Sequence, residues 1–266
     1  MVYKEITMNK RILVVLMCAA VILLVVLLGI SVFGNPVAKM LAQRGAERYL
    51  EAAYPGEDFY IDRLQYNSKT GRYEAKIQSR SSVDSHFDVG ISKTGKVEFD
   101  TYESNVLSKW NTVNRICNEY SELAVPVLKT LNLKYTLEYT LATIEISPLE
   151  KNGNVPGFAL RAEEIQIDGF YDIRELGKQA GVLTVGARDE HVSAEKAAEI
   201  LLEMKKTMDN AGIPFYGICF SLSSPKADDG IEVQRKEINV ELIRYEEICE
   251  DGFTDRLSSL AAVKDQ

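Results

Sequence analysis

A run of apolar residues near the N-terminus constrains this chain more than any other feature. Residues 12–33 carry no charge, and only Gly29 and Ser31 interrupt a succession dominated by Leu, Val, Ile, Ala and Met. At ~1.5 Å per residue, a helix of this length matches the ~30 Å hydrocarbon core of a bilayer. The sequence therefore predicts a transmembrane helix over residues 12–33, preceded by a cytoplasmic tail over residues 1–11.

A cleaved signal peptide is the alternative to a retained anchor. The apolar region of a signal peptide normally covers ~7–15 residues and leads to a small-residue cleavage site. This run is longer, and Val32-Phe33-Gly34 is a poor cleavage site. Lys10 and Arg11 directly precede the run, and positive flanking charge favours the cytoplasmic side. We therefore expect a single-pass protein of the cell membrane, bound to the lipid bilayer through residues 12–33, with its later domains extracytoplasmic.

The rest of the chain is acidic. The first 34 residues have a net charge of +2, because three basic residues oppose Glu5. Since the whole chain has a net charge of −8, the remaining residues carry about −10. This balance argues against nucleic acid as a partner and against docking on anionic lipid.

The region after the apolar run predicts an α+β domain over residues 37–127, built as helix, about four strands and helix. Apolar residues recur at helical spacing over residues 40–53 and stop at Tyr54-Pro55-Gly56. The period then changes to two, as in residues 72–78, which is typical of an antiparallel sheet with one covered face.

Turns and a second helix complete this expectation. The tetrapeptide Ser-Lys-Thr-Gly occurs at residues 68–71 and again at 92–95, and each copy places glycine where a short hairpin needs positive φ. A further apolar stripe over residues 106–124 predicts a helix that Pro126 ends, with Trp110 on its buried face.

Residues 128–266 predict a second α+β domain, again with helices covering a largely antiparallel sheet. In chain order we expect an alternating strand at 135–141, strands near 158–167 and 182–188 flanking a short helix at 172–180, a long helix from the N-cap Ser193 to Gly212, a hairpin of 215–222 with 231–244, and a final helix at 248–261.

The order of these motifs resembles a known family. The sequence Gly34-Asn35-Pro36-Val37 is followed by Ala46-Glu47-Arg48-Tyr49-Leu50-Glu51, by Tyr54-Pro55-Gly56, and by Asp100-Thr101-Tyr102. Together they resemble the uncharacterised, membrane-anchored YfjL-like proteins of Gram-positive bacteria, which have an N-terminal and a C-terminal domain. That resemblance implies an exported two-domain protein and brings no catalytic residues. The first domain is also loosely similar to PepSY and cystatin-like modules, an analogy of architecture alone.

Chemistry-bearing residues form no recognisable catalytic pattern. Asp84, His86 and Asp88 would share one face of a strand, so they could form a small polar or metal-binding patch, although a solvated face is the simpler interpretation. His191 precedes a helix outside any HExxH motif. Cys219 lies in an apolar strand, where a thiol is usually inert, and its pairing with Cys249 stays open.

Adjacent carboxylates are the other candidates. The three pairs are Glu163-Glu164, Asp228-Asp229 and Glu246-Glu247. Adjacent side chains point in different directions on a strand or helix, whereas a glycosidase needs two carboxylates that face each other across a cleft. We therefore assign no catalytic, cofactor-binding or metal-binding residue from the sequence.

The expected function is that of a non-enzymatic binding or regulatory module at the cell envelope, with an envelope protein or a peptide as partner. Exposed sheet edges could take such a peptide as an added strand. The alternatives are an envelope hydrolase that acts on wall or peptide substrates, and a sensor that acts through a membrane partner.

Overall fold

The computed structural model of the protein describes residues 10–147, 157–225, 236–260 and 262–265. The chain divides into two compact units, Met1–Ser108 and Lys109–Gln266. Each unit has its own sheet and its own buried apolar core. The protein is therefore α+β with two sheet-containing domains, as the sequence predicts.

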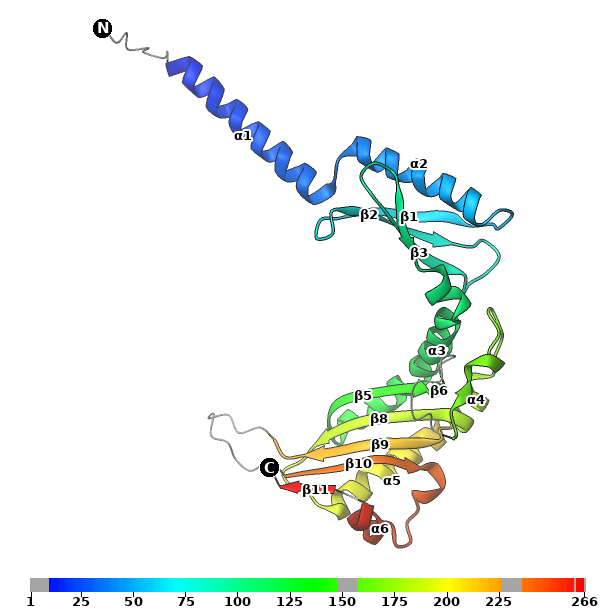
Figure 1. Ribbon diagram of the computed structural model, residues 1–266. Coiled ribbons are helices and arrows are strands. Elements are labelled where there is room, and N and C mark those ends of the chain that lie inside the picture. The colour runs from blue at the N-terminus through cyan, green and yellow to red at the C-terminus, as the bar shows by residue number, and fades with distance from the viewer. Residues whose placement is uncertain (1–9, 148–156, 226–235, 261, 266) are drawn as a thin grey trace, which may run out of the picture. The chain divides into compact units, whose positions relative to one another are not determined.

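Unit 1 is a four-stranded antiparallel sheet covered by one helix (Figure 1). Its elements are α1 (Lys10–Phe33), α2 (Pro36–Ala53), β1 (Tyr60–Asn67), β2 (Arg72–Gln78), β3 (His86–Ile91), β4 (Val97–Asp100) and the π-helical turn η1 (Glu103–Leu107). The strands lie in the order β1-β2-β3-β4, and Gly71 and Gly95 adopt φ of 70° and 84° in the turns, as the repeated tetrapeptide predicts.

The prediction of a transmembrane helix over residues 12–33 is contradicted. Within the described part of the chain, no helix combines the length and the apolarity needed to cross a membrane.

Helix α2 contacts the backbone of the β3–β4 turn because its inner face is made largely of small residues. Asn35 caps the helix by accepting a hydrogen bond from the Val37 backbone N–H at 2.9 Å, and Pro36 occupies the first helical position. A Cβ atom added at Gly45 would lie 2.0 Å from the carbonyl oxygen of Gly95, so only glycine permits this approach. The helix ends at Tyr54, as predicted. The buried residues of this face are Ala38, Ala42, Gly45, Ala46 and Leu50.

Unit 2 contains a larger, mixed sheet. Its elements are α3 (Trp110–Lys129), η2 (Thr130–Leu133), β5 (Thr136–Ile144), β6 (Ile146–Ser147), β7 (Leu160–Arg161), η3 (Ala162–Glu164), α4 (Ile173–Ala180), β8 (Gly181–Arg188), α5 (Ala194–Asn210), β9 (Gly217–Ser223), β10 (Lys236–Arg244), η4 (Tyr245–Glu247), α6 (Phe253–Leu260) and β11 (Ala262–Asp265). The five-stranded sheet has the order β11-β10-β9-β8-β5, and β6 pairs with β7 separately.

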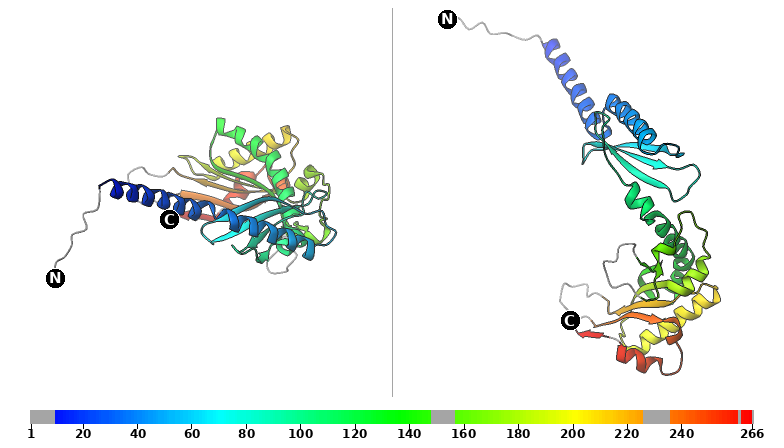
Figure 2. Two further views of the ribbon diagram at one scale, coloured as in Figure 1. Left: turned by 90° about the horizontal axis from the view of Figure 1, so that it is seen from above. Right: turned by 45° about the vertical axis from the view of Figure 1, so that its right-hand side comes forward.

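Helices α3, α5 and α6 pack on one face of this sheet (Figures 1 and 2). Large side chains fill the layer between them, including Tyr120 on α3 and Leu201 and Met204 on α5, all fully buried. The N-cap at Ser193 is confirmed, because its hydroxyl oxygen accepts a hydrogen bond from the Lys196 backbone N–H at 3.2 Å. The hairpin of β9 with β10 is also confirmed as antiparallel.

Helix α3 differs from the sequence-based expectation in three respects. It belongs to unit 2, because Ile116, Tyr120 and Leu128 are buried in the core of the five-stranded sheet. It continues past Pro126 to Lys129, since burial of Leu128 compensates for the backbone hydrogen bond that proline lacks. Trp110 is 56% exposed at the first helical position, so its expected place in the core is wrong.

Smaller differences concern the sheet of unit 2. Strands β8 and β9 run parallel, so the sheet is mixed. The expected strand over residues 158–167 is reduced to β7, and the short helix η3 follows it directly. Strand β11, with Ala262–Asp265, lies beyond the final predicted helix, was not predicted, and pairs with β10.

Candidate functional site

The three residues of the predicted polar patch differ in burial and partners. Asp84 is buried before β3 begins, whereas His86 is exposed on that strand. Asp88 forms an ion pair with Lys76 at 3.1 Å, and its backbone N–H donates to the Thr101 hydroxyl. Among the residues that the structure describes, no group of three His, Cys, Asp or Glu side chains could hold a metal ion.

The remaining sequence candidates are also dispersed. His191 is exposed and lies 3.9 Å from the Asp189 carboxylate. Cys219 and Cys249 are both free thiols, and burial raises the pKa of Cys219. Such a thiol is mostly protonated at neutral pH and is a poor nucleophile.

The two carboxylate pairs that the structure describes give no facing arrangement either. Glu163 and Glu164 lie in the short helix η3, and the carboxylates of Glu246 and Glu247 both pair with Arg244. The pair at residues 228–229 lies outside the described residues.

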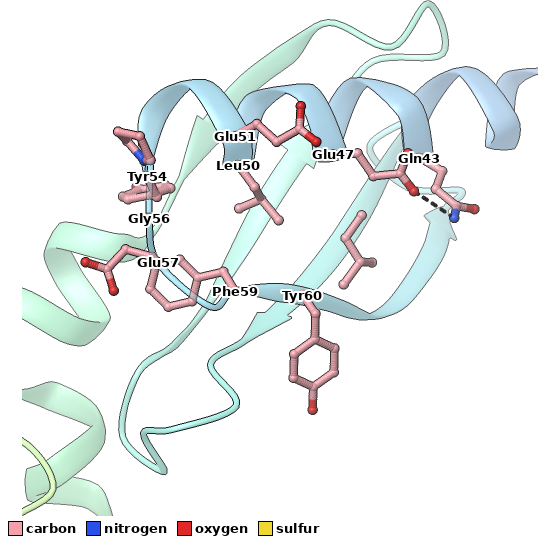
Figure 3. A pocket seen from close by; sticks show the side chains of 11 residues that line it. Gln43, Glu47, Leu50, Glu51, Tyr54, Gly56, Glu57, Phe59 and Tyr60 are labelled. Atoms are coloured by element: carbon pink, nitrogen blue, oxygen red, sulfur yellow. Dashed lines mark hydrogen bonds between the residues drawn. The ribbon is translucent and has the colours of Figure 1, made fainter.

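Unit 1 contains a groove that is lined by described residues. It lies between the C-terminal half of α2 and the start of β1 and has a volume of about 520 Å³. Figure 3 shows Leu50 on α2 above the segment that carries Phe59 and Tyr60, with Glu47 and Glu51 on the same helix. The lining residues are Gln43, Glu47, Leu50, Glu51, Tyr54, Pro55, Gly56, Glu57, Phe59, Tyr60 and Ile61.

The groove combines a negative rim with an apolar floor. Its lining includes the carboxylates of Glu47, Glu51 and Glu57 and contains no Lys or Arg. All three acidic residues are exposed, whereas Leu50 is buried and Phe59 is half-buried. A ligand with positive charge and an adjoining apolar group would match both features.

The electrostatics of α2 are locally unfavourable at this groove. Glu47 and Glu51 are four residues apart on one helical face, and like charges at that spacing destabilise a helix by ~0.2–0.5 kcal/mol. Glu51 also lies in the last turn, where the helix dipole favours cations, and the turn contains no basic residue. The Gln43 amide donates a hydrogen bond to Glu47 at 3.1 Å, the dashed line in Figure 3, and leaves both charges in place.

An aromatic cluster holds one wall of the groove in position. Tyr54 packs against Phe59 with ring centroids 5.5 Å apart and against Tyr102 at 4.8 Å. The hydroxyls of Tyr49 and Tyr54 both donate to one carboxylate oxygen of Asp100, the latter at 2.8 Å. Burial, reinforced by the Asp100 carboxylate, raises the pKa of Tyr54, so its phenol stays a neutral donor. These bonds fix the end of α2 to the end of β4.

Two other hollows are weaker candidates. One in unit 2 has a volume of about 360 Å³, and the Asp209 carboxylate on its wall already accepts a hydrogen bond from the Tyr245 hydroxyl at 3.1 Å. Another, of about 340 Å³, lies at the loop after β2. There the Ser79 hydroxyl donates to Asp58 at 2.5 Å and accepts from the backbone N–H groups of Ser81 and Ser82, so it shapes the loop.

The groove was absent from the sequence-based candidates, although one signal for it existed. Glu47 and Glu51 at a spacing of four near a helix C-terminus conflict with helix electrostatics, and such local conflicts often mark functional positions. Phe59 and Tyr102 could not be assigned to the same wall, because only the folded sheet brings β4 beside the end of α2.

Comparison with known proteins agrees with the two-unit division. The family model described as YfjL-like, N-terminal domain, matches residues 9–101, and the one described as YfjL-like C-terminal domain matches residues 119–258. No curated protein matches the chain. A crystal structure of a DUF5037 family protein from Ruminococcus gnavus is 13% identical over 82% of this chain and 98% of that one, with a TM-score of 0.22.

Proposed function

The chain belongs to the YfjL-like family, a family of uncharacterised function, and we propose that it is a non-enzymatic binding module whose unit 1 recognises a basic polypeptide segment. The groove between α2 and β1 is the proposed binding site. The observation that carries this proposal is the pair Glu47 and Glu51 on one face of α2, where the two carboxylates repel each other and Glu51 also opposes the helix dipole.

A bound Lys or Arg side chain relieves both conflicts at once. Its positive charge compensates the repulsion between Glu47 and Glu51 and interacts favourably with the C-terminal end of the helix dipole. Glu57, on the segment that leads into β1, adds a third carboxylate to the same groove. The ligand therefore contributes an interaction that the free protein lacks.

The apolar floor specifies what accompanies the charge. Leu50, Phe59 and Ile61 line the groove below the carboxylates. A peptide that places an apolar side chain beside a basic one matches this combination, and the aliphatic stem of Lys or Arg also packs on apolar surface. An isolated metal ion would leave this floor unused.

The neighbouring edge of β1 is less suited to strand addition. The strand is paired with β2 alone, but its register shifts between Ile61 and Arg63. A bulge and charged residues on an edge strand hinder the addition of a further strand. The expectation that a peptide adds to a sheet edge is therefore replaced, for unit 1, by insertion of side chains into the groove.

The alternatives from the sequence gain no specific support from this groove. A hydrolase would place two carboxylates on opposite sides of a substrate, whereas Glu47 and Glu51 project from one face of one helix. An envelope location and an envelope protein or peptide partner are predictions, which fractionation of cells that express the full chain would test.

Fluorescence polarisation with two labelled peptides tests the proposed function. A short peptide of alternating Lys and Leu should bind the full chain, and its affinity should fall as salt is added. A peptide of alternating Glu and Leu has the same apolar content and should not bind. The double variant Glu47→Gln, Glu51→Gln should weaken binding of the basic peptide by about fivefold, since exposed charge pairs contribute up to ~1 kcal/mol each.

The matched control is Glu122→Gln, which removes an exposed carboxylate from helix α3 in unit 2. This variant changes the net charge by one and should leave the affinity unchanged. Equal binding of the two peptides, or full affinity in the double variant, contradicts the proposed site.

A further inference from the structure

The hollow of about 360 Å³ in unit 2 lies where helix α5 ends. Its volume is near the lower end of the ~300–1,000 Å³ that is typical of small-ligand sites, so it suits a ligand about the size of an amino acid. Residues 212–215, which follow α5, give it a largely apolar wall, and the buried side chains of Ile213 and Phe215 belong to that wall.

Hydrogen bonds hold this wall in place. The Pro214 carbonyl accepts from the Tyr120 hydroxyl at 3.0 Å, and the Gly212 carbonyl accepts from the Arg174 Nε–H at 3.0 Å. The segment is therefore fixed to α3 and α4 before any ligand arrives. A preformed wall lowers the cost of ordering that binding would otherwise carry.

Tyr245 lines another part of the hollow and is also held by the protein. Its ring packs edge-on against Phe215 with centroids 5.1 Å apart, and its hydroxyl donates to Oδ1 of Asp209 at 3.1 Å. The Lys205 ammonium lies 4.0 Å from the centroid of the same ring and donates to the backbone carbonyls of Tyr245 and Ile248. Tyr245 and Lys205 are thus engaged within unit 2.

Two opposite charges line the hollow without meeting each other. Lys178 and Asp209 both belong to the lining, and within the described part of the chain no hydrogen bond or ion pair engages the Lys178 ammonium. Asp209 uses Oδ1 for the Tyr245 hydroxyl, so Oδ2 can accept a further bond. Asp209 also lies in the last turn of α5, where the helix dipole favours a cation. The hollow therefore offers one partner for an anionic group and one for a cationic group.

We propose that this hollow binds a small zwitterion with an apolar body, namely a free amino acid such as leucine. Its carboxylate pairs with the Lys178 ammonium, its ammonium pairs with Oδ2 of Asp209, and its side chain covers the apolar wall of residues 212–215. A simple anion or cation would leave one of the two charges unpaired, and a polar amino acid would leave the wall uncovered. The site lies in unit 2 and is independent of the peptide groove in unit 1.

Saturation-transfer difference NMR on the full chain tests the proposal with probes that differ in charge. Leucine carries both charges, leucinamide lacks the carboxylate, and N-acetylleucine lacks the ammonium. Leucine should bind most tightly, and each blocked form should bind about fivefold more weakly, which is the effect of one exposed ion pair. Serine has both charges but no apolar side chain, and it should bind more weakly than all three.

Two variants assign the charges to their partners. Lys178→Gln should weaken leucine binding about fivefold and leave leucinamide binding unchanged, because leucinamide has no carboxylate to lose. Asp209→Asn should weaken leucine binding to the same extent and leave N-acetylleucine binding unchanged. Asparagine keeps an oxygen that can accept from the Tyr245 hydroxyl, so the wall of the hollow is retained.

The matched control is Lys206→Gln, which removes an exposed charge of α5 outside the lining. This variant should bind leucine as the parent chain does. Absence of leucine binding, equal affinities for the three leucine probes, or an equal effect of Lys178→Gln on leucine and leucinamide overturns the proposal.

Discussion

The two units cover their sheets in opposite ways. In unit 1 the inner face of α2 is made of alanine and glycine except for Leu50, and the helix touches the backbone of the β3–β4 turn. In unit 2 the inner faces of α3 and α5 carry Ile, Leu, Met and Tyr side chains, which fill a thicker layer.

This difference goes with a different placement of the large side chains in each unit. The small residues of α2 leave the large aromatic side chains of unit 1 gathered at the end of the helix, where they form one wall of a groove. In unit 2 large side chains fill the core, and the exposed large apolar residues, among them Tyr139, Leu141 and Phe170, lie outside it.

The largest expected effect tests the thick layer of unit 2. Leu201 is fully buried on α5, and Leu201→Ala should lower the free energy of unfolding of unit 2 by about 4 kcal/mol through lost burial and a cavity. Urea denaturation followed by the fluorescence of Trp110, the single tryptophan of the chain and a residue of unit 2, measures it. Hydrogen exchange in β2 and β3 should be unchanged, and a parallel loss of protection there would contradict independent cores.

The next prediction tests the close contact in unit 1. Gly45→Ala places a methyl group against the backbone carbonyl of Gly95, so α2 must shift, at a cost of about 3 kcal/mol. Hydrogen exchange of β2 and β3 measures the loss. The matched control is Gly29→Ala in α1, where an added Cβ meets nothing within 4 Å. The Gly29→Ala variant should leave the stability of unit 1 unchanged. Equal hydrogen-exchange protection in the two variants would refute the close-contact interpretation.

A third comparison concerns tyrosine hydroxyls. Tyr54→Phe removes a hydrogen bond to the Asp100 carboxylate and should destabilise unit 1 by about 2 kcal/mol, because bonds to charged groups contribute more than neutral ones. Tyr139→Phe removes a bond between two hydroxyls at an exposed site of unit 2 and should cost about 0.5 kcal/mol. Denaturant unfolding measures the loss of unfolding free energy in both variants. A larger loss in Tyr139→Phe than in Tyr54→Phe would contradict this prediction.

The same tyrosine gives a pH dependence. Burial and Asp100 raise the pKa of Tyr54 in the folded state, so the folded protein keeps this proton when the unfolded chain begins to lose it near pH ~10. The resulting stabilisation is complete below that pH and declines as the pH rises further. Stability of unit 1 between neutral and alkaline pH should therefore fall less steeply in Tyr54→Phe than in the parent chain.

The smallest effect has the opposite sign. Glu51→Gln removes both the repulsion from Glu47 and the unfavourable position at the helix C-terminus, so it should stabilise unit 1 by about 0.5 kcal/mol. The same change should weaken binding of the basic peptide. If Glu51→Gln stabilises unit 1 but leaves the affinity for the basic peptide unchanged, the charge repulsion on α2 does not contribute to peptide binding, and the proposed function is contradicted.

Local patterns in the sequence were sufficient for most of the secondary structure. The two-residue period predicts β2, β3 and β4, the repeated Ser-Lys-Thr-Gly predicts both turns, and Ser193 and Gly212 bound α5 correctly. These features depend on neighbouring residues, which the sequence specifies directly. The YfjL-like resemblance is confirmed for both domains, although it assigned no functional residues.

Tertiary structure decided what depends on distant residues. Whether α3 joins the first or the second sheet depends on which core receives Tyr120, and its amphipathic stripe is compatible with either. The parallel pairing of β8 with β9 and the position of β5 at a rim depend on strand order, which periodicity does not encode. The groove needs α2, β1 and β4 to meet at Tyr54 and Asp100, residues 46 positions apart in the chain. By itself the sequence determined which segments are helices and strands; packing determined which of their faces stay open to bind.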